Sequence, residues 1–537
     1  MSQHTDKPTV DSLASKALAG SINKRQFMQG AMALGLTAAA ATTAWSTKVE
    51  AATPKRGGHF RVALDDGNTT DTANPALYEG NYQICMGYTH RNWLTEITPE
   101  NGVGPDIAES WEASPDATTW TFNLTKGVEF HNGKTLTAQD VVDTLNFHRN
   151  PESKSAALAL LNSVTEIKKD GDNKVVIKLS SGSADLPFVL TDYHLCILPS
   201  DGEGNVDYSI GAGTGAYECT NFEPGVRCDF KRNPNYFKEG KGNFDSSELI
   251  SISDVNARQN ALSTGEMDAI NELDLKTAGL MAKNPNLNVI EVSSGTFITL
   301  AMHVDVAPFD NPDVRLALKY AFPREEALQK VLRGHGTIGN DHPIAPVLPY
   351  WADLEQREFD IEKAKEHLKK AGLSSLKIDF STSDVPMPGG VDLAILYKER
   401  ASAAGIDINV IREPNDGYWS NVWLKKPFCL VSWGQRPTPD VMFSLAYSAD
   451  ADWNESHYKG ERFNELLIQA RAELDQTKRA AQYREMQQII RDEGGNIIPF
   501  FRNYVYAASK KVHVPEQLSG NWALDGNRGI ERWWFNS

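Results

Sequence analysis

A short segment in the second half of the chain combines side chains suited to holding a small charged molecule. The run 428–431 predicts a buried strand, and directly after it come Trp433, Gly434, Gln435 and Arg436. An indole ring stacks on flat or apolar groups, and a guanidinium supplies a permanent positive charge with a planar set of donors. We therefore predict a binding loop here. The alternative is that Trp433 lies in the core and that Arg436 pairs with Asp440 on the surface.

A second aromatic segment precedes this strand in the chain. Residues 413–423 include Tyr418, Trp419 and Trp423. Ligand pockets form preferentially at domain junctions, where aromatic and apolar walls carry a few polar groups. We predict that Tyr418 and Trp419 line the same pocket as loop 433–436.

Signatures of covalent catalysis, of metal binding and of cofactor binding are missing from the sequence. It has no Gly-x-Ser-x-Gly or His-Glu-x-x-His motif, and Ser374 and Lys377 form a Ser-x-x-Lys pair without its partner motifs. The five cysteines lack zinc-site spacing, and the acidic loop 201–207 lacks the final glutamate of a calcium loop. We predict a protein that is not an enzyme, with no catalytic residues, no metal site and no cofactor.

The first 51 residues predict an export signal. Lys24 and Arg25 precede an uncharged run rich in Ala, Gly and Thr that extends to Trp45, and small residues before position 52 suit a cleavage site. The basic pair with Phe27 resembles a twin-arginine signal in which one Arg is replaced. The alternatives are an amphipathic helix of the folded domain or a membrane anchor. An exported protein of this kind works in the periplasm.

Composition narrows the range of partners. The chain has 54 Lys and Arg against 70 Asp and Glu, a formal net charge of −16. Such a surface repels nucleic acid and anionic lipid, so we expect neither as a main partner. The 537 residues are too many for a single core, and they predict two or three lobes.

Two cysteines flank a predicted hairpin. Asn221 to Gly225 ends in Pro-Gly, a turn signal between two strand-like runs, so a hairpin centred there brings Cys219 and Cys228 close together. A disulfide would form in an oxidising compartment if the cross-strand geometry suits it. Two reduced, half-buried thiols are the equal alternative.

The predicted elements alternate along the chain. Strands are expected at 58–64, 120–124 and 174–179, where apolar and polar residues alternate. Helices are expected at 137–146, with a capping box from Thr137 and Asp140, at 360–370, and at 462–491 with a break near Asp475. Interleaved strands and helices without repeats predict an α/β or mixed α+β class. Arg315, Lys319 and Arg324 are expected either on a solvated helix face or as helix-end charges, with Arg324 near a helix C-terminus.

Several longer motifs carry a family resemblance. In chain order they are IAESWE (107–112), SPD (114–116), WTFNLTKGVEFHNG (120–133), LTAQDVV (136–142), GTGAY (213–217), RNPNYF (232–237), PFDNPDVR (308–315) with ALKYA (317–321), and AKEHLKKAG (364–372). Their order and spacing resemble the extracytoplasmic solute-binding proteins of family 5. These are the dipeptide-, oligopeptide- and nickel-binding components of ABC importers.

The resemblance implies an α/β fold of the two-lobed periplasmic binding protein type (type II-like, cluster C) with an extra inserted subdomain. It implies a split first lobe from residues 53–78, 196–293 and 504–537. The inserted subdomain would span 79–195, and the second lobe 294–503. The resemblance also implies a monomer that delivers its solute to permease subunits in the inner membrane.

The substrate is where this chain departs from its relatives. Dipeptide-binding members hold the peptide ammonium with an Asp in loop 433–440 and the carboxylate with an Arg after the strand at 376–380. Here the second of these loops contains Thr382 and Asp384, and the first contains Arg436. The resemblance therefore implies a peptide or peptide-like, anionic solute, with Asp384 facing any amine. The rival hypothesis is an exported hydrolase acting on a peptide-like substrate.

Overall fold

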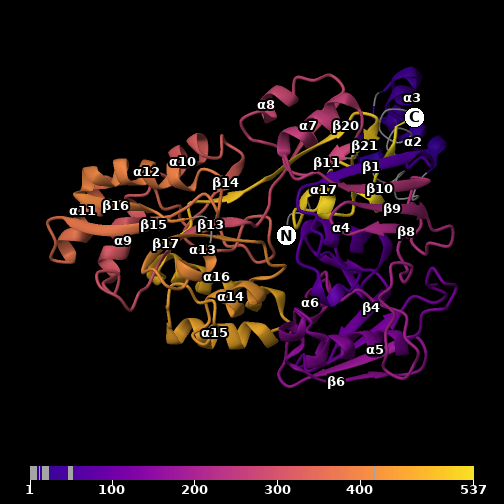
Figure 1. Ribbon diagram of the computed structural model, residues 1–537, viewed down its shortest axis with the longest axis horizontal. Coiled ribbons are helices and arrows are strands. Elements are labelled where there is room, and N and C mark those ends of the chain that lie inside the picture. Colours follow the sequence, from indigo (N-terminus) through magenta and orange to yellow (C-terminus); the bar gives the residue numbers. More distant parts are fainter. Residues whose placement is uncertain are drawn as a thin grey trace.

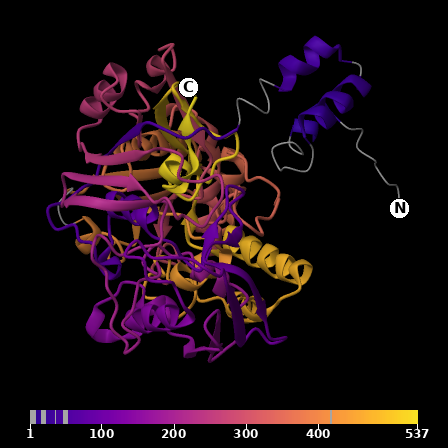
Figure 2. The ribbon, with the colours of Figure 1, turned by 90° about the vertical axis from the view of Figure 1, so that its right-hand side faces the viewer.

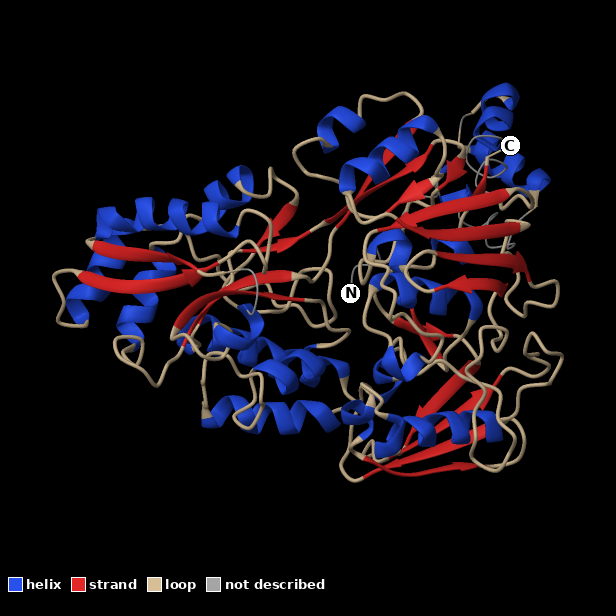
Figure 3. Ribbon diagram, in the orientation of Figure 1, coloured by secondary structure: helices blue, strands red, loops and turns tan. Residues whose placement is uncertain are grey.

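Two mixed sheets form the framework of the molecule (Figure 1). The computed structural model describes residues 9–10, 12–14, 23–34, 36–45, 53–414 and 418–536. Strands and helices alternate through these ranges, which confirms the predicted α/β class (Figure 3). We call the part built on the first sheet the first lobe and the part built on the second sheet the second lobe.

The first sheet combines parallel and antiparallel strands. Its order is β12 (Leu287–Val292), β20 (Tyr504–Ser509), β11 (Ala269–Ile270), β1 (His59–Leu64), β10 (Ser246–Ser251), β9 (Arg227–Arg232) and β8 (Tyr217–Glu223). Strand β1 pairs in parallel with β10 and β11, so the carboxyl ends of these three strands meet at one edge. The strands come from segments that the predicted split lobe contains, while its exact boundaries stay a prediction.

The second sheet is organised in the same way. Its order is β14 (Gly336–Ile338), β19 (Phe500–Arg502), β13 (Phe297–Met302), β17 (Phe428–Trp433), β15 (Leu376–Thr382) and β16 (Ile406–Arg412), with β18 (Asn496–Ile497) beside β13. Strand β15 pairs in parallel with β16 and β17. Their carboxyl ends, which lead into Asp384 and Gly434, therefore share one edge.

Two segments connect the lobes as nearly continuous strands. Residues 293–296 link β12 to β13, and Asn503 alone separates β19 from β20. In Figure 1 the yellow strand of this second connection runs from one sheet to the other. The two connections lie close together, because the backbone amide of Arg502 donates to the Thr296 carbonyl (2.8 Å).

A third sheet lies within the region 79–195, which the family resemblance predicts as an inserted subdomain. Its order is β4 (Ala108–Ala113), β5 (Thr119–Leu124), β7 (Lys174–Leu179) and β6 (Val164–Lys169), and β2 (Thr95–Ile97) pairs with β3 (Val103–Pro105). The subdomain also contacts the second lobe directly. The buried carboxylate of Asp185 pairs with Arg479 (2.7 Å) and accepts from the Thr438 hydroxyl (2.6 Å).

Helices cover both large sheets. Those of the first lobe and its insertion are α4 (Asn81–His90), α5 (Ala138–Arg149), α6 (Leu186–Val189), α7 (Val255–Thr264), α8 (Ala278–Met281), α17 (Ala523–Gly526) and α18 (Gly529–Arg532). Those of the second lobe are α9 (Pro312–Tyr320), α10 (Arg324–Lys330), α11 (Ile361–Lys370), α12 (Gly390–Ala401), α13 (Tyr418–Asn421), α14 (Pro439–Ala446), α15 (Glu461–Ala472) and α16 (Gln476–Glu493). The short pair β21 (Val512–His513) and β22 (Trp534–Phe535) lies near the end of the chain.

The predicted helix starts are confirmed by their caps. The Thr137 amide donates to Asp140 (2.9 Å), which completes the capping box of α5. Asp360 accepts from the amides of the first turn of α11, and Asp475 does the same for α16. The break expected near Asp475 is thus the boundary between α15 and α16, where a carboxylate satisfies amides that have no partner within the helix.

Among the described residues of the leader, two helices have full bounds. These are α2 (Lys24–Ala33), which starts at the predicted basic pair, and α3 (Ala38–Trp45). Figure 2 shows them to one side of the rest of the chain, and their apolar cluster, which includes Phe27 and Ala41, consists of residues 10–44 alone. The predicted cleavage position at Ala51 lies outside the described residues. Nowhere in the described ranges is a helix both long and apolar enough to cross a membrane.

The predicted hairpin is present, but its two cysteines are not bridged. Strands β8 and β9 pair around Gly225, which has the positive φ of +70° that this turn needs. A bulge after Cys219 shifts the register, so Cys219 lies opposite Phe230 and Cys228 opposite Phe222. Both thiols are buried and free. Of the two alternatives, the structure therefore has the reduced thiols.

Of the two alternatives for Arg315, Lys319 and Arg324, the solvated face is wrong, because all three side chains are buried. The alternative of helix-end charges is correct for Arg315 and Lys319. Arg315 and Lys319 donate to carbonyls at the end of α16, and Arg324 donates to both oxygens of Asp341 (2.6 and 2.7 Å). Carbonyls without partners at a helix end attract cations, which is why these charges point inward.

Asp341 is the centre of a buried ion cluster. It also accepts from Arg357 (2.9 Å) and from the Ile498 amide (3.1 Å). Burial opposes its ionisation, but Arg324 and Arg357 outweigh this and hold the pKa of Asp341 below its ordinary value. The cluster joins the start of α10 to the strand segment that leads into β19.

We expect Asp341→Asn to destabilise the protein by about 3–5 kcal/mol, since it leaves the buried guanidinium of Arg324 without its anion and removes one of the two carboxylates that pair with Arg357. Asn tolerates the positive φ of +60° at this position, so the effect reports charge rather than backbone strain. Urea unfolding measures the change. Glu326→Gln, which breaks the more exposed pair with Arg400, should cost less than about 1 kcal/mol. An equal loss of unfolding free energy in Asp341→Asn and Glu326→Gln would contradict the importance of the buried charge of Asp341.

Candidate functional site

A cavity of about 1060 Å³ lies between the two lobes. Its walls come from the carboxyl ends of parallel strands in both large sheets and from the segments that connect the lobes. Strand ends of this kind are where α/β sheets bind ligands, because the loops that follow them are free to vary. The volume suits a molecule the size of a short peptide.

The first-lobe wall carries carboxylates. Asp65 and Asp66 follow β1, and Asn271 follows β11 and donates to Asp65 (2.7 Å). Asp66 accepts from the amides of Asn81 and Tyr82 at the start of α4. Burial is the main reason that the pKa of Asp66 lies above its ordinary value. This wall therefore presents two carboxylates. Asp65 is held by the side-chain amide of Asn271, and Asp66 is held by main-chain amides at the start of α4.

The second-lobe wall contains two of the predicted residues. Asp384 follows β15 and Gly434 follows β17, and both line the cavity. Asp384 accepts from the Val391 amide at 3.3 Å and lies 3.7 Å from Arg412, whose side chain is 72% exposed. This ion pair is loose, so Asp384 retains the capacity to meet an amine.

Arg502 lines the cavity from the connection between the lobes, and sequence reasoning missed it. Its main chain is fixed by Thr296 and by the Ser294 hydroxyl, which donates to the Arg502 carbonyl (2.6 Å). Its guanidinium has no hydrogen bond or ion pair within the described ranges. The available signal was a lone charge inside the apolar run 497–508.

The predicted loop 433–436 is held by bonds of its own. Arg436 donates to the carbonyls of Gly434 (3.1 Å) and Gln435 (3.2 Å), and its guanidinium lies 5.9 Å from the centre of the Trp433 ring. Gln435 accepts from the Gly295 amide (2.7 Å). The loop is therefore attached to the connection between the lobes.

The alternative pairing of Arg436 with Asp440 is wrong, since Asp440 pairs with Arg471 (3.2 Å). The alternative that Trp433 lies in the core, however, is correct. Its side chain is only 4% exposed and packs with Trp423 and Trp453. The prediction that Trp433 stacks on a ligand is corrected accordingly, because its faces are already covered.

Two further predicted residues are also placed differently. The Tyr418 side chain is buried and donates to the Leu430 carbonyl (2.8 Å), and Thr382 is buried and donates to the Gly390 carbonyl (3.1 Å). Both support the strand ends from behind. Trp419 is 42% exposed, with its ring edge-on to Tyr418 and Trp423.

Glu455 lies beneath the tryptophan cluster. It accepts from the indoles of Trp423 (2.9 Å) and Trp433 (3.1 Å) and from the Asn496 amide group (3.2 Å). Burial raises the pKa of Glu455 to about 7, although the three donors favour the ionised form. The carboxyl group directly behind the loop thus titrates near neutral pH.

Comparison with known families identifies the class of protein. The profile "Bacterial extracellular solute-binding proteins, family 5 Middle" matches residues 102–455. The chain belongs to this family. It is therefore a solute-binding protein, as the motifs predicted, and the hydrolase alternative finds no support among its relatives.

Two named relatives align with most of the chain. The dipeptide-binding protein of Escherichia coli is 25% identical over 515 residues, which is 87% of this chain and 92% of the relative. The glutathione-binding protein GsiB of Salmonella typhi is 25% identical over 493 residues, or 87% of this chain and 91% of the relative.

Solved structures confirm the fold of the binding protein. The substrate-binding protein CtaP of Listeria monocytogenes has a TM-score of 0.78 at 20% identity and covers 90% of this chain and 100% of its own. The periplasmic binding protein DppA of Helicobacter pylori, solved with a peptide, has a TM-score of 0.73 at 21% identity, covering 90% and 99%. The predicted two-lobed periplasmic binding protein fold is thereby confirmed.

We expect the stability of the binding protein to fall between about pH 4.5 and 7 through Glu455. The pKa of this group is about 7 in the folded protein and near 4.3 in the unfolded chain. The folded state therefore binds more protons in this window, and stability falls as the pH rises through it. Glu455→Gln should remove this component of the pH profile, as measured by urea unfolding at several pH values.

The matched control for this experiment is Glu366→Gln on the exposed surface of α11, where the side chain is 61% exposed. Glu366→Gln should leave the dependence of the unfolding free energy on pH unchanged between pH 5 and 7. A Glu455→Gln profile parallel to that of the unmodified protein would refute the assignment.

Proposed function

We propose that this protein is the periplasmic component of an ABC importer and that its solute is a small peptide or a peptide-like anionic molecule. The observation that carries the proposal is the inter-lobe cavity, whose walls hold carboxylates from both lobes and the free guanidinium of Arg502. A zwitterionic solute needs both signs of charge within one pocket. The names of the dipeptide- and glutathione-binding relatives support the same class of solute.

In the proposed complex, Arg502 binds the anionic group of the solute in the depth of the cavity. A guanidinium binds a carboxylate through two parallel hydrogen bonds, which gives direction as well as affinity. Asp384 and Asp65 are the partners for an amine from the two opposite walls. Gly434 leaves room for the solute main chain beside the loop, and Arg436 supplies a second positive charge next to it.

Hinge closure is the proposed mechanism of capture. Within the described residues, the two large sheets are joined through the segments 293–296 and 503 beside the cavity, so a rotation needs changes at few residues. A solute that contacts Asp65 on one lobe and Asp384 on the other favours the closed form. The permease subunits would then recognise the closed protein, which acts as a monomer.

The leader fits export to the periplasm. The basic pair at the start of α2 and the uncharged helix α3 are the features that suggested a twin-arginine-like route. The family description, which names extracellular proteins, supports a location outside the cytoplasm.

The direct test of the proposed function is binding without consumption. Mass spectrometry of the purified protein should find a peptide or peptide-like molecule bound, and that molecule should be recovered unchanged after incubation. Conversion of the solute by the purified protein would favour the hydrolase instead.

We expect Arg502→Ala to weaken binding of the co-purified solute by roughly thirtyfold or more, because loss of one partner from a desolvated charge pair typically costs about 2–5 kcal/mol. Arg502→Lys should recover only part, since the planar fork is lost. The same comparison for Arg436→Ala and Arg436→Lys tests the second cation. Calorimetric titration measures each affinity.

Arg462→Ala provides the control, because this exposed arginine pairs with Glu485 on the surface between α15 and α16. Its affinity should equal that of the unmodified protein. Normal binding by Arg502→Ala would refute the proposed anion site. Normal binding by Arg436→Ala would show that Arg436 only makes hydrogen bonds within loop 433–436 and does not contact the solute.

A further inference from the structure

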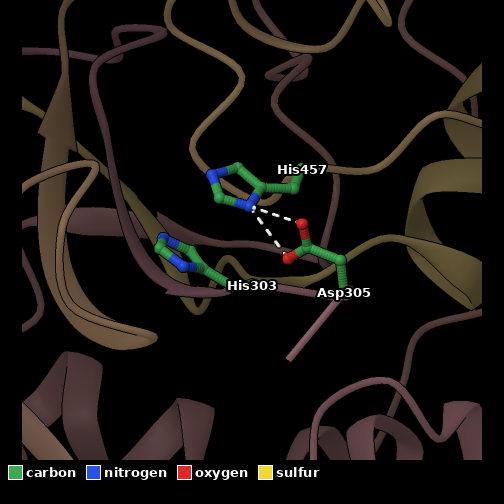
Figure 4. Close-up of side chains that lie close together, drawn as sticks. All are labelled: His303, Asp305 and His457. Carbon is green, nitrogen blue, oxygen red and sulfur yellow. Dashed lines mark hydrogen bonds and ion pairs between the residues drawn. The ribbon is translucent and has the colours of Figure 1, made fainter. Parts of the chain in front are cut away.

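A group of metal-ligating side chains lies in the second lobe, apart from the cavity. His303, Asp305 and His457 bring their ligand atoms within 4.8 Å of one another (Figure 4). The Nδ1 atom of His457 lies 2.9 and 3.1 Å from the two carboxylate oxygens of Asp305. The rings of His303 and His457 stack with their centres 4.0 Å apart. Two imidazoles and one carboxylate thus share one small volume.

The main chain holds these residues in place. The His303 amide donates to the Pro427 carbonyl (2.9 Å), and the amide of Val304 donates to the Ser456 carbonyl (2.9 Å). These bonds fix the segment after β13 against the loop that carries His457. His457 itself adopts a positive φ of +56°, a conformation that a residue with a side chain rarely takes. The loop therefore directs His457 toward the other two residues despite backbone strain.

The His303 ring is buried against the ring of His457. It makes no hydrogen bond or ion pair with any residue in the described ranges, although it is only 6% exposed. A plain His–Asp ion pair would need only His457 and Asp305.

The site is accessible from one side. The side chains of Asp305 and His457 are 60% and 33% exposed. A cation can therefore enter past Asp305, and water can complete its coordination. His303 closes the inner side.

We propose that His303, Asp305 and His457 form a site for a divalent transition metal of the zinc class. Imidazole nitrogen and carboxylate oxygen are the ligands that Zn²⁺ takes in proteins, and three protein ligands leave one position for water. Spacing in the sequence gave no sign of the site, because Asp305 and His457 are 152 positions apart. The prediction of no metal site came from cysteine spacing and local motifs, which do not detect a group assembled by folding.

The site is separate from solute binding. It follows the last residue of β13, whereas the residues before β13 line the cavity. At about 3.3 Å per residue, the seven steps from Thr296 to His303 span roughly 23 Å. Metal binding at His303, Asp305 and His457 therefore does not depend on the identity of the solute.

The test is titration of the EDTA-treated full chain with ZnCl₂ by calorimetry, with thermal unfolding measured in parallel. We expect one saturable site per chain and a higher unfolding temperature in the presence of Zn²⁺, because a metal that binds only the folded state stabilises it. Asp305→Asn and His457→Ala should each weaken Zn²⁺ binding tenfold or more. Asp305→Asn keeps the size of the side chain, so it separates lost ligation from lost folding.

The matched control is His367→Ala. His367 makes a comparable pair with Asp313 (2.7 Å) but lies beside a tyrosine ring and has no second histidine. Its loss should leave Zn²⁺ binding unchanged. Absence of saturable binding, or equal Zn²⁺ affinity in the unmodified protein and Asp305→Asn, would overturn the proposal.

Discussion

The direction of the parallel strands is the constraint on which the rest of the molecule depends. Strand β1 runs beside β10 and β11, and β15 runs beside β16 and β17, so each sheet collects its carboxyl ends at one edge. The two connections between the lobes place those edges opposite each other. Asp65, Asn271 and Asp384, which each follow such a strand, then line the same cavity.

The sequence predicted the local features of the fold well. Alternation identified β1, β5 and β7, and the caps at Thr137, Asp360 and Asp475 gave the starts of their helices. These signals are contained within a few residues. The two-lobed fold came from the family motifs, because no local signal states which strands will pair across nearly 200 positions, as β1 and β10 do.

Prediction of the site was less complete for the same physical reason. The loop after β17 was found because a buried strand followed by polar residues is a local pattern. Arg502 was missed, because its exposure to the cavity depends on the pairing of β19 and β20 with two different sheets. The burial of Trp433 depends on Glu455 and Trp453, which are distant in the sequence and lie against it only after folding. The burial of a charged side chain is equally hard to predict, since no local sequence pattern distinguishes buried Arg324 from the more exposed Arg400.

The contact of Asp185 with Arg479 and Thr438 has a consequence for how sharply the lobes respond to solute. A buried ion pair gains about as much from attraction as it loses in hydration, so opening this contact returns both groups to water at little net cost. This contact therefore adds little bias toward either arrangement of the lobes. A shift from 99% open to 99% closed needs about 5.5 kcal/mol of differential affinity, and a shift from equal populations to 99% closed needs about half of that. The smaller the bias of the empty protein toward the open form, the smaller the preference for the closed form that a solute needs in order to close most molecules.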